Sequence, residues 1–124
     1  MKLRKIDGSY AVAQLSADDD VPVWLNGPGL TAMVRTDDEL TIVCDETRVP
    51  QDINAQRGWA CFRSIGPFAF DEAGVVASLV APISAQGIGV FVLCTFDGEH
   101  ILCPSEHFAV VQDILVTQGH DFVD

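Results

Sequence analysis

Two short acidic segments stand where a small ligand could be held, and the first is Asp71-Glu72-Ala73-Gly74. It lies between a strand-like run and a helix-like run. A helix N-terminus presents unpaired N–H groups and the positive end of its dipole, which suit a ligand carboxylate, and Glu72 could accept a ligand ammonium. Gly74 would let a ligand approach the backbone closely. The same residues also fit a structural role, with Asp71 as N-cap, Glu72 complementing the dipole and Gly74 permitting close helix–sheet packing.

The second acidic segment is Asp97-Gly98-Glu99, in which Asp97-Gly98 is the strongest hairpin signal of the sequence. Acids that flank a turn are usually solvated, so the pattern alone does not assign them to a ligand. Phe96 closes the apolar strand before this turn and is the one aromatic residue worth testing as a ligand contact. The other aromatic residues near these segments fit core or interface positions: Phe68, Phe70 and Phe91.

No catalytic motif is present in the sequence. It has no G-x-S-x-G nucleophile elbow and no H-E-x-x-H zinc motif, and Gly87-Ile-Gly89 is too short a match to a phosphate-binding loop. His100, His107 and His120 fit surface or structural roles. The sequence therefore predicts a protein that is not an enzyme and uses no cofactor.

The four cysteines are expected to be reduced and buried, because each lies in an apolar or β-branched run and none forms a C-x-x-C pair. They are Cys44, Cys61, Cys94 and Cys103. A zinc site built from Cys94, Cys103 and His107 is conceivable, but this spacing matches no standard pattern. No metal site is predicted.

Composition limits the class of protein. The 124 residues are 48% hydrophobic, which suffices for a packed core, and the formal net charge is -11. Such a surface repels phosphate backbones, so no nucleic-acid partner is predicted. No apolar run is long enough to cross a bilayer, and Met-Lys-Leu-Arg-Lys leads into polar residues without a signal-peptide hydrophobic region. We expect a cytoplasmic protein without membrane association.

The second half of the sequence has the clearest element pattern. A strand over 58–65 ends at Gly66-Pro67, and a helix capped by Asp71, with Phe70 and Val75 as a hydrophobic staple, runs to about Gln86. Pro82 should kink or break this helix. A long and central strand over 88–96, a hairpin return over 100–103, a helix from Pro104-Ser105 to Gly119 and a short strand over 121–124 follow. The order βαββαβ predicts a ferredoxin-like antiparallel sheet with both helices on one face.

The first half reads as a reduced copy of the second. Strands are expected over 10–15, 30–36 and 40–44, with a connector over 49–56 and no long helix. Thr36, Asp38, Ile42 and Cys44 recur as Thr95, Asp97, Ile101 and Cys103, always 59 positions later (95 minus 36). We therefore expect an α+β protein with a degenerate half at 1–57 and a complete domain at 58–124.

Four segments of the sequence resemble the ACT domains of the CASTOR arginine sensors and the regulatory ACT domains of aspartate kinases. They are G-W-A-C-F-R-S-I-G-P-F at 58–68, E-A-G-V-V-A-S-L-V-A-P-I at 72–83, G-I-G-V-F at 87–91 and T-F-D-G-E-H-I-L-C-P-S-E-H-F at 95–108. The upstream E-L-T-I-V-C-D-E-T-R-V-P at 39–50 resembles the segment that precedes such a domain. The resemblance implies non-catalytic binding of a small molecule, usually an amino acid, at a domain–domain interface.

The resemblance also implies a site. In CASTOR-like domains the ligand contacts fall on the loop before the first helix and on the hairpin after the second strand, which here gives Glu72, Gly74, Val75, Thr95, Phe96 and Glu99. The family hairpin commonly reads S-T-Y-x-x-D, whereas this chain has Cys94-Thr-Phe-Asp-Gly-Glu99. By analogy the chain would be a small stand-alone tandem ACT protein that forms a homodimer and controls an enzyme or transporter. The other hypothesis is a protein-interaction module with a vestigial pocket.

Overall fold

The computed structural model describes residues 1–124, and the chain forms two compact units. Unit 1 consists of Met1–Ile6 together with Ala60–Asp124, and unit 2 is Asp7–Trp59. Two long strands, β1 (Lys2–Leu15) and β4 (Ala55–Ser64), contribute residues to both units. No helix in the structure has the length and apolar character needed to cross a bilayer.

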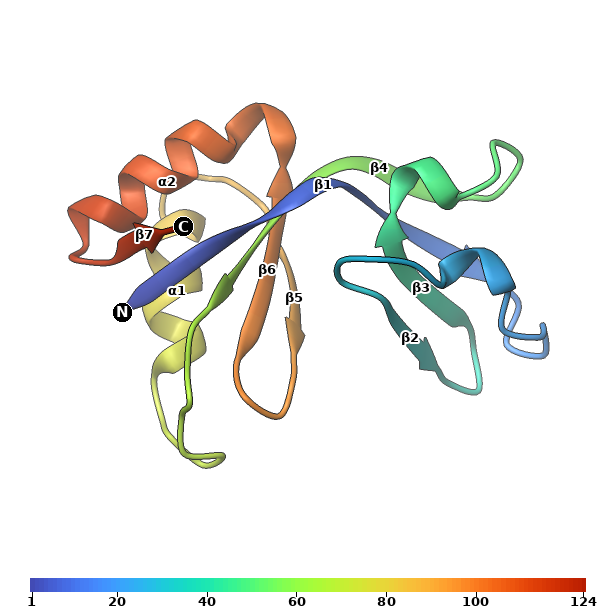
Figure 1. The fold of residues 1–124 in the computed structure, drawn as a ribbon, viewed down its shortest axis with the longest axis horizontal. Coiled ribbons are helices and arrows are strands. Elements are labelled where there is room, and N and C mark those ends of the chain that lie inside the picture. The colour runs from blue at the N-terminus through green and yellow to red at the C-terminus, as the bar shows by residue number, and fades with distance from the viewer. The chain divides into compact units, whose positions relative to one another are not determined.

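Unit 1 carries the predicted βαββαβ order, which is confirmed. After β4 come α1 (Val75–Ser84), β5 (Phe91–Cys94), β6 (Glu99–Pro104), the short 3₁₀ helix η3 (Ser105–His107), α2 (Phe108–Thr117) and β7 (Asp121–Val123). Its strands lie in the order β7, β1, β4, β6, β5 (Figure 1).

The start of β1 is a strand that the sequence analysis missed. Lys2, Leu3 and Arg4 pair in parallel with Asp121, Phe122 and Val123 of β7. On its other side β1 runs antiparallel to β4, since Ile65 N donates to Lys2 O at 3.0 Å and Gln14 N donates to Asn54 O at 2.9 Å. The strand was predicted only from Tyr10, because the charged residues near the N-terminus mask the alternation that buries Leu3.

The position predicted for the strand over 88–96 is wrong, because β5 is short and lies at the edge of the sheet. It pairs only with β6, in the register Phe91 to Leu102 through Cys94 to Glu99. Ile88, Val90 and Val92 pack against the core of unit 1, so the apolar run reflects burial of one side and not hydrogen bonding on both edges.

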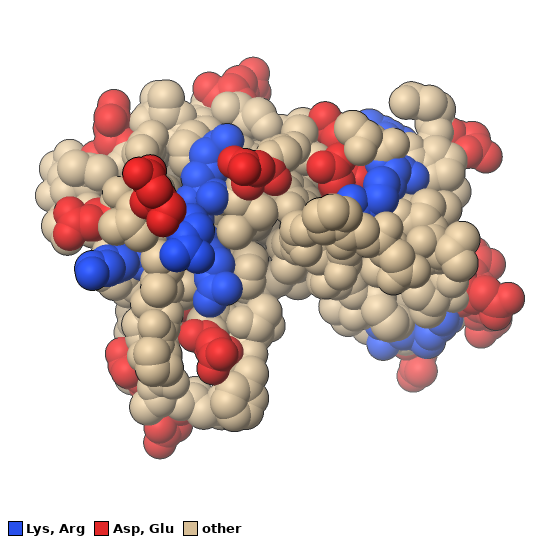
Figure 2. Space-filling model, viewed as in Figure 1, with Lys and Arg blue, Asp and Glu red and all other residues tan.

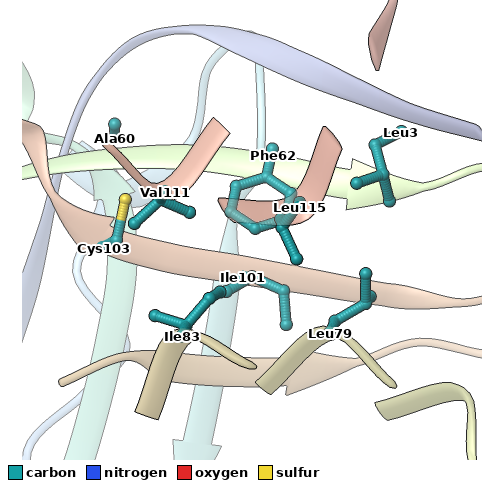
Figure 3. Close-up of a cluster of buried hydrophobic side chains, with 9 residues drawn as sticks. All are labelled: Leu3, Ala60, Phe62, Leu79, Ile83, Ile101, Cys103, Val111 and Leu115. Atoms are coloured by element: carbon teal, nitrogen blue, oxygen red, sulfur yellow. The ribbon is translucent and has the colours of Figure 1, made fainter. Parts of the chain in front are cut away.

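The core of unit 1 fills the space between one face of the sheet and the two helices (Figure 3). Strand residues two apart supply one layer, with Ala60 and Phe62 on β4 and Ile101 and Cys103 on β6. The helices supply the other layer: Leu79 and Ile83 from α1, and Val111 and Leu115 from α2. Both helices therefore cover the same face, as predicted.

Helix α1 continues through Pro82 to Ser84, so of the predicted kink or break the break is wrong. Proline has no N–H to give to the carbonyl of Ser78, four residues earlier. His120 compensates, because its Nε2 lies 3.3 Å from Ser78 O. The helix ends as predicted near Gly87, whose φ of 77° reverses the chain.

Unit 2 repeats the hairpin of unit 1. Strands β2 (Ala32–Arg35) and β3 (Leu40–Asp45) pair from Ala32 to Val43 through Arg35 to Leu40, which is the β5–β6 register shifted by 59 positions. The turns match as well, since Thr36 N donates to Glu39 O at 2.9 Å and Thr95 N donates to Gly98 O at 2.7 Å. The predicted internal repeat is thus present at the level of hydrogen bonding.

Only two 3₁₀ helices, η1 (Val23–Leu25) and η2 (Glu46–Arg48), stand in unit 2 where unit 1 has α-helices. η2 lies 59 positions before η3, which continues into α2, whereas no α-helix follows η2. Pro50 explains why η2 stops, because a residue before proline is disfavoured in the helical region, and Val49 has φ -81° and ψ 121°. A small second core surrounds Leu40, Ile42 and Cys44.

All four cysteines are free, but the expectation that all are buried is wrong for Cys94, which is exposed at the end of β5. Burial raises the pKa of the other three thiols, to about 12 for Cys61 and about 11 for Cys103. Those thiols remain protonated at neutral pH and behave as small apolar side chains.

Candidate functional site

A cleft of about 220 Å³ opens in unit 1 between the loop before α1 and the β5–β6 hairpin. Five of the six residues predicted to bind a ligand line it: Glu72, Val75, Thr95, Phe96 and Glu99. Gly74 does not line the cleft and lies at the N-cap of α1 between two residues that do. The structure thus brings together two segments that are about twenty positions apart in the sequence.

The start of α1 differs from the prediction. Asp71 is not the N-cap; Gly74 is, and no side chain caps the helix. The staple is also wrong, because Phe70 is 82% exposed. A helix that begins three residues later than expected leaves its first-turn N–H groups without a side-chain acceptor, and Val75 of that turn lines the cleft.

Gly74 is explained by its backbone conformation. Its φ is 87°, in the left-handed region that side chains disfavour, and a Cβ built there would meet no atom within 4 Å. Close helix–sheet packing is therefore not the reason for glycine at this position. The positive φ of Gly74 therefore accounts for a glycine at the N-cap of α1.

Ser64 is a site residue that the sequence analysis missed. It is fully buried at the end of β4, where its Oγ donates to Glu99 Oε2 at 2.7 Å and accepts from Glu99 N at 3.0 Å. Gly98 fits against it, because a Cβ on Gly98 would lie 2.7 Å from Ser64 Oγ. A signal was available: Ala60, Phe62 and Ser64 share a strand face, so a hydroxyl stands at a core position.

The cleft is acidic. Glu72, Asp97 and Glu99 line it, and no Lys, Arg or His does. In Figure 2 an opening is visible in the lower part of unit 1, with Asp or Glu atoms on its rim. A cationic or ammonium group is therefore the partner that these side chains favour, whereas the α1 N-terminus favours a carboxylate.

Two phenylalanine rings stand at the mouth of the cleft. Phe70 is 82% exposed and Phe96 is 81% exposed, and their centroids are 5.5 Å apart with the rings tilted by 45°. Neither ring is therefore part of the core, and of the core or interface positions predicted for Phe70 the core is wrong. Their rings can contact a ligand in the cleft or an apolar surface placed over it.

His100, next to Glu99 on β6, is 8% exposed, and its Nδ1 has no hydrogen-bond partner. Burial lowers its pKa and so does the nearby Arg63 guanidinium, while Glu99 opposes them. His120 is also buried, and burial and the Met1 amino group, 2.9 Å from its Nδ1, lower its pKa. His107 is half exposed, 3.8 Å from Glu106. Both buried rings therefore fit structural positions.

No group of three or more His, Cys, Asp or Glu side chains in the structure is close enough to hold a metal ion. The cleft contains acids, a threonine hydroxyl and aromatic rings, but no base paired with a nucleophile.

Comparisons with known proteins bear on the family and the fold of the chain. A family model described as the ACT domain matches residues 54–117, and a second model, described as an N-terminal domain, matches residues 8–52. The rat protein named "Cytosolic arginine sensor for mTORC1 subunit 1" is 36% identical over 58 residues, and its human counterpart is 34% identical over the same length. The match covers 46% of this chain and only 18% of each sensor.

Solved structures match over nearly the whole chain. A crystal structure of an Agrobacterium tumefaciens protein is 48% identical with a TM-score of 0.93, covering 98% of this chain and 91% of that one. Aspartate kinase of Clostridium acetobutylicum has a TM-score of 0.68 at 8% identity, covering 94% of this chain and 34% of the kinase, so it shares the fold. Because the ACT model spans more than half of its residues, this chain belongs to the ACT domain family.

Proposed function

We propose that this protein is a non-catalytic regulatory module that binds an amino acid in the acidic cleft of unit 1. The observation that carries the proposal is the convergence of Glu72, Thr95 and Glu99 with the uncapped start of α1. An amino acid bears an ammonium group for the carboxylates and a carboxylate for the helix N–H groups, so one small ligand satisfies both.

The size and charge of the cleft support a small, positively charged ligand. Its volume of about 220 Å³ is below the roughly 300–1,000 Å³ of sites for drug-sized molecules. Three acids and no cation line it, so a ligand with an additional positive charge would gain most. The sensors that resemble 58 residues of this chain are named for arginine, whose side chain carries such a charge.

We propose that the working form is a homodimer of a stand-alone tandem ACT protein, with 1–57 and 58–124 as its two repeats. The cleft is open, and Phe70 and Phe96 project at its mouth with most of their surface in solvent. A second copy placed over them would bury these rings and enclose the ligand. Ligand binding would then shift the dimer equilibrium, and an enzyme or transporter in the cytoplasm would read that shift.

A second function is favoured by the same exposed rings. If the cleft is vestigial, Phe70 and Phe96 would serve as the apolar anchor of a protein-interaction module. This module would respond to its partner and to no small molecule.

A thermal-shift screen of the purified protein against the twenty amino acids separates the two functions. A ligand at a hundredfold excess over its Kd should add about 2.7 kcal/mol to the stability, which raises Tm by several degrees. The decisive variants are Glu72→Gln and Glu99→Gln, which remove charge from the cleft. Glu106→Gln is the matched control, since this exposed residue on η3 does not line the cleft.

The expected result is a rise in Tm with one or a few amino acids, reduced in both cleft variants and kept in Glu106→Gln. A rise that survives both cleft substitutions would mean that the ligand binds elsewhere. A flat screen at millimolar concentrations, together with a concentration-dependent dimer, would support the interaction module instead.

A further inference from the structure

The arginines of this chain fall into two groups. Arg35, Arg48 and Arg57 in unit 2 all donate from their terminal Nη atoms to backbone carbonyls: Arg35 to Asp19 O at 2.8 Å, Arg48 to Leu25 O at 3.4 Å and Arg57 to Pro50 O at 2.8 Å. These three side chains therefore serve to hold loops. Arg4 and Arg63 in unit 1 do not follow this pattern.

The side chain of Arg4 makes no hydrogen bond, and that of Arg63 uses only its Nε, which donates to Ser64 O at 2.9 Å. The only ion pair in the structure is between His107 and Glu106, so no carboxylate lies within 4.0 Å of any Lys or Arg. The Nη groups of Arg4 and Arg63 therefore keep their full capacity to donate, although the chain carries 18 acidic residues.

Arg4 and Arg63 lie beside each other. Ile65 N donates to Lys2 O in the antiparallel β1–β4 pair, and two residues further along each strand stand Arg4 and Arg63. Leu3, Phe62 and Ser64 face the helices, so both arginines project from the opposite face of the sheet. Two like charges at cross-strand positions are unfavourable without a counter-charge, which suggests a function for the pair.

Both arginines line one hollow of about 300 Å³, together with Ile65, Gly66, Pro67 and Asp97. Figure 2 shows Lys and Arg side chains gathered in a band over the part of unit 1 where β1 runs. Gly66 lies directly against the β5–β6 hairpin, because a Cβ on residue 66 would be only 2.6 Å from Asp97 O. The hollow is distinct from the acidic cleft, and the two share only Asp97 as a lining residue.

We propose that Arg4 and Arg63 form a binding site for an oxyanion, a phosphate or carboxylate group of a small metabolite. Paired guanidinium groups present planar sets of N–H donors that match the oxygens of such groups in two-point contacts. Asp97 on the rim repels the bound anion and limits its affinity. This site is independent of the amino-acid site proposed above, and it can exist whether or not that site does.

The test is an NMR titration of the full chain with inorganic phosphate and, in a second arm, with acetate, at ionic strength held constant with sodium chloride. The variants are Arg4→Gln, Arg63→Gln and Asp97→Asn. Lys5→Gln is the matched control, since it also removes one positive charge and Lys5 is the neighbour of Arg4 in the sequence. The Nζ of Lys5 lies 5.3 Å from the centroid of the Phe108 ring, away from the hollow. Glu99→Gln reports on the separate acidic cleft.

Each arginine variant should weaken binding about tenfold, because hydrogen bonds to charged groups are the strong ones. Asp97→Asn should tighten it, while Lys5→Gln and Glu99→Gln should leave it unchanged. Saturation by phosphate alone identifies a phosphate site, and saturation by acetate identifies a carboxylate site. The proposal is overturned if neither anion gives a saturable shift, or if Lys5→Gln weakens binding as much as the arginine variants do.

Discussion

At the scale of single residues, Ser64 and Gly98 hold the acid on which the cleft depends. The Ser64 hydroxyl joins the Glu99 carboxylate to the Glu99 N–H, and it does so in the space that a side chain on residue 98 would occupy. Glu99 therefore enters the cleft with a fixed orientation, so that less conformational entropy is lost when a ligand binds.

Ser64→Ala should lower the free energy of unfolding by about 1–3 kcal/mol, because it leaves the Glu99 N–H without its acceptor. Gly98→Ala should also destabilise, since its Cβ would press on Ser64 Oγ. Urea unfolding of both variants and of the double variant measures their coupling. The double variant should be less destabilised than the sum, and strict additivity would show that the two side chains do not meet.

Two buried histidines should make stability depend on pH. The pKa values of His100 and His120 are lowered in the folded protein, so the unfolded chain, with values near 6.5, binds protons more readily. Stability is therefore complete above about pH 6.5 and is lost as pH falls toward the folded values, by at most about 1.4 kcal/mol per pH unit for each histidine.

Urea unfolding between pH 8 and pH 5.5 measures this loss. His100→Gln and His120→Gln should each flatten the dependence, whatever they do to stability at pH 8. A wild-type stability that stays constant over this range would show that both rings protonate as easily in the folded protein as in the unfolded chain.

At the scale of elements, the first turn of α1 depends on the backbone of Gly74. Gly74→Ala should destabilise the protein by about 1–2 kcal/mol, because alanine resists the left-handed conformation although the surrounding space is open. Gly89→Ala is the control, since it has equally open space without a positive φ and should be neutral or slightly stabilising. Thermal unfolding of both variants is the measurement. Equal Tm values would mean that strain at residue 74 does not matter.

The elements show what periodicity and turn chemistry can reveal. The sequence predicts the hairpin turns and the helix ends near Gly87 and Gly119, because each depends on local residue types. It does not predict the N-terminal part of β1 or the edge position of β5, since both depend on which strands become neighbours. The sequence predicts Asp71 as the N-cap because aspartate is a favoured cap residue, but Gly74 is the N-cap of α1.

The candidate site also divides into residues that local patterns reveal and residues that depend on which strands become neighbours. The acids and the hairpin could be named from the sequence, and the resemblance grouped them with Val75 and Phe96. Ser64 was missed because its role exists only when β4 and β6 are neighbours and Glu99 faces it. The free state of Arg4 and Arg63 likewise appears only when the hydrogen bonds of all five arginines are compared.

At the scale of the whole molecule, the two units share a hairpin but differ at the position that holds Glu99 in unit 1. The positions 59 residues before Phe96 and Glu99 hold Asp37 and Leu40, and Leu40 is fully buried. Unit 2 therefore has the same turn geometry as the hairpin of unit 1, but it has a leucine where unit 1 has Glu99. This asymmetry predicts one amino-acid site in each chain.

Isothermal titration with the amino acid that stabilises the protein most should give one bound ligand per chain. Glu99→Gln should abolish measurable binding or weaken it strongly, and Asp37→Asn should not change it. Two ligands per chain, or a loss of binding in Asp37→Asn, would show that unit 2 contributes a site of its own.

The central claim is that an amino acid binds between the first turn of α1 and the β5–β6 hairpin. Its most direct test is an amide NMR titration of the full chain with each of the twenty amino acids. The account predicts saturable shifts at the amides of residues 75–77 and 95–99 with at least one amino acid, and their loss in Glu99→Gln. Shifts confined to other segments, or no saturable shift with any amino acid at millimolar concentration, would contradict it.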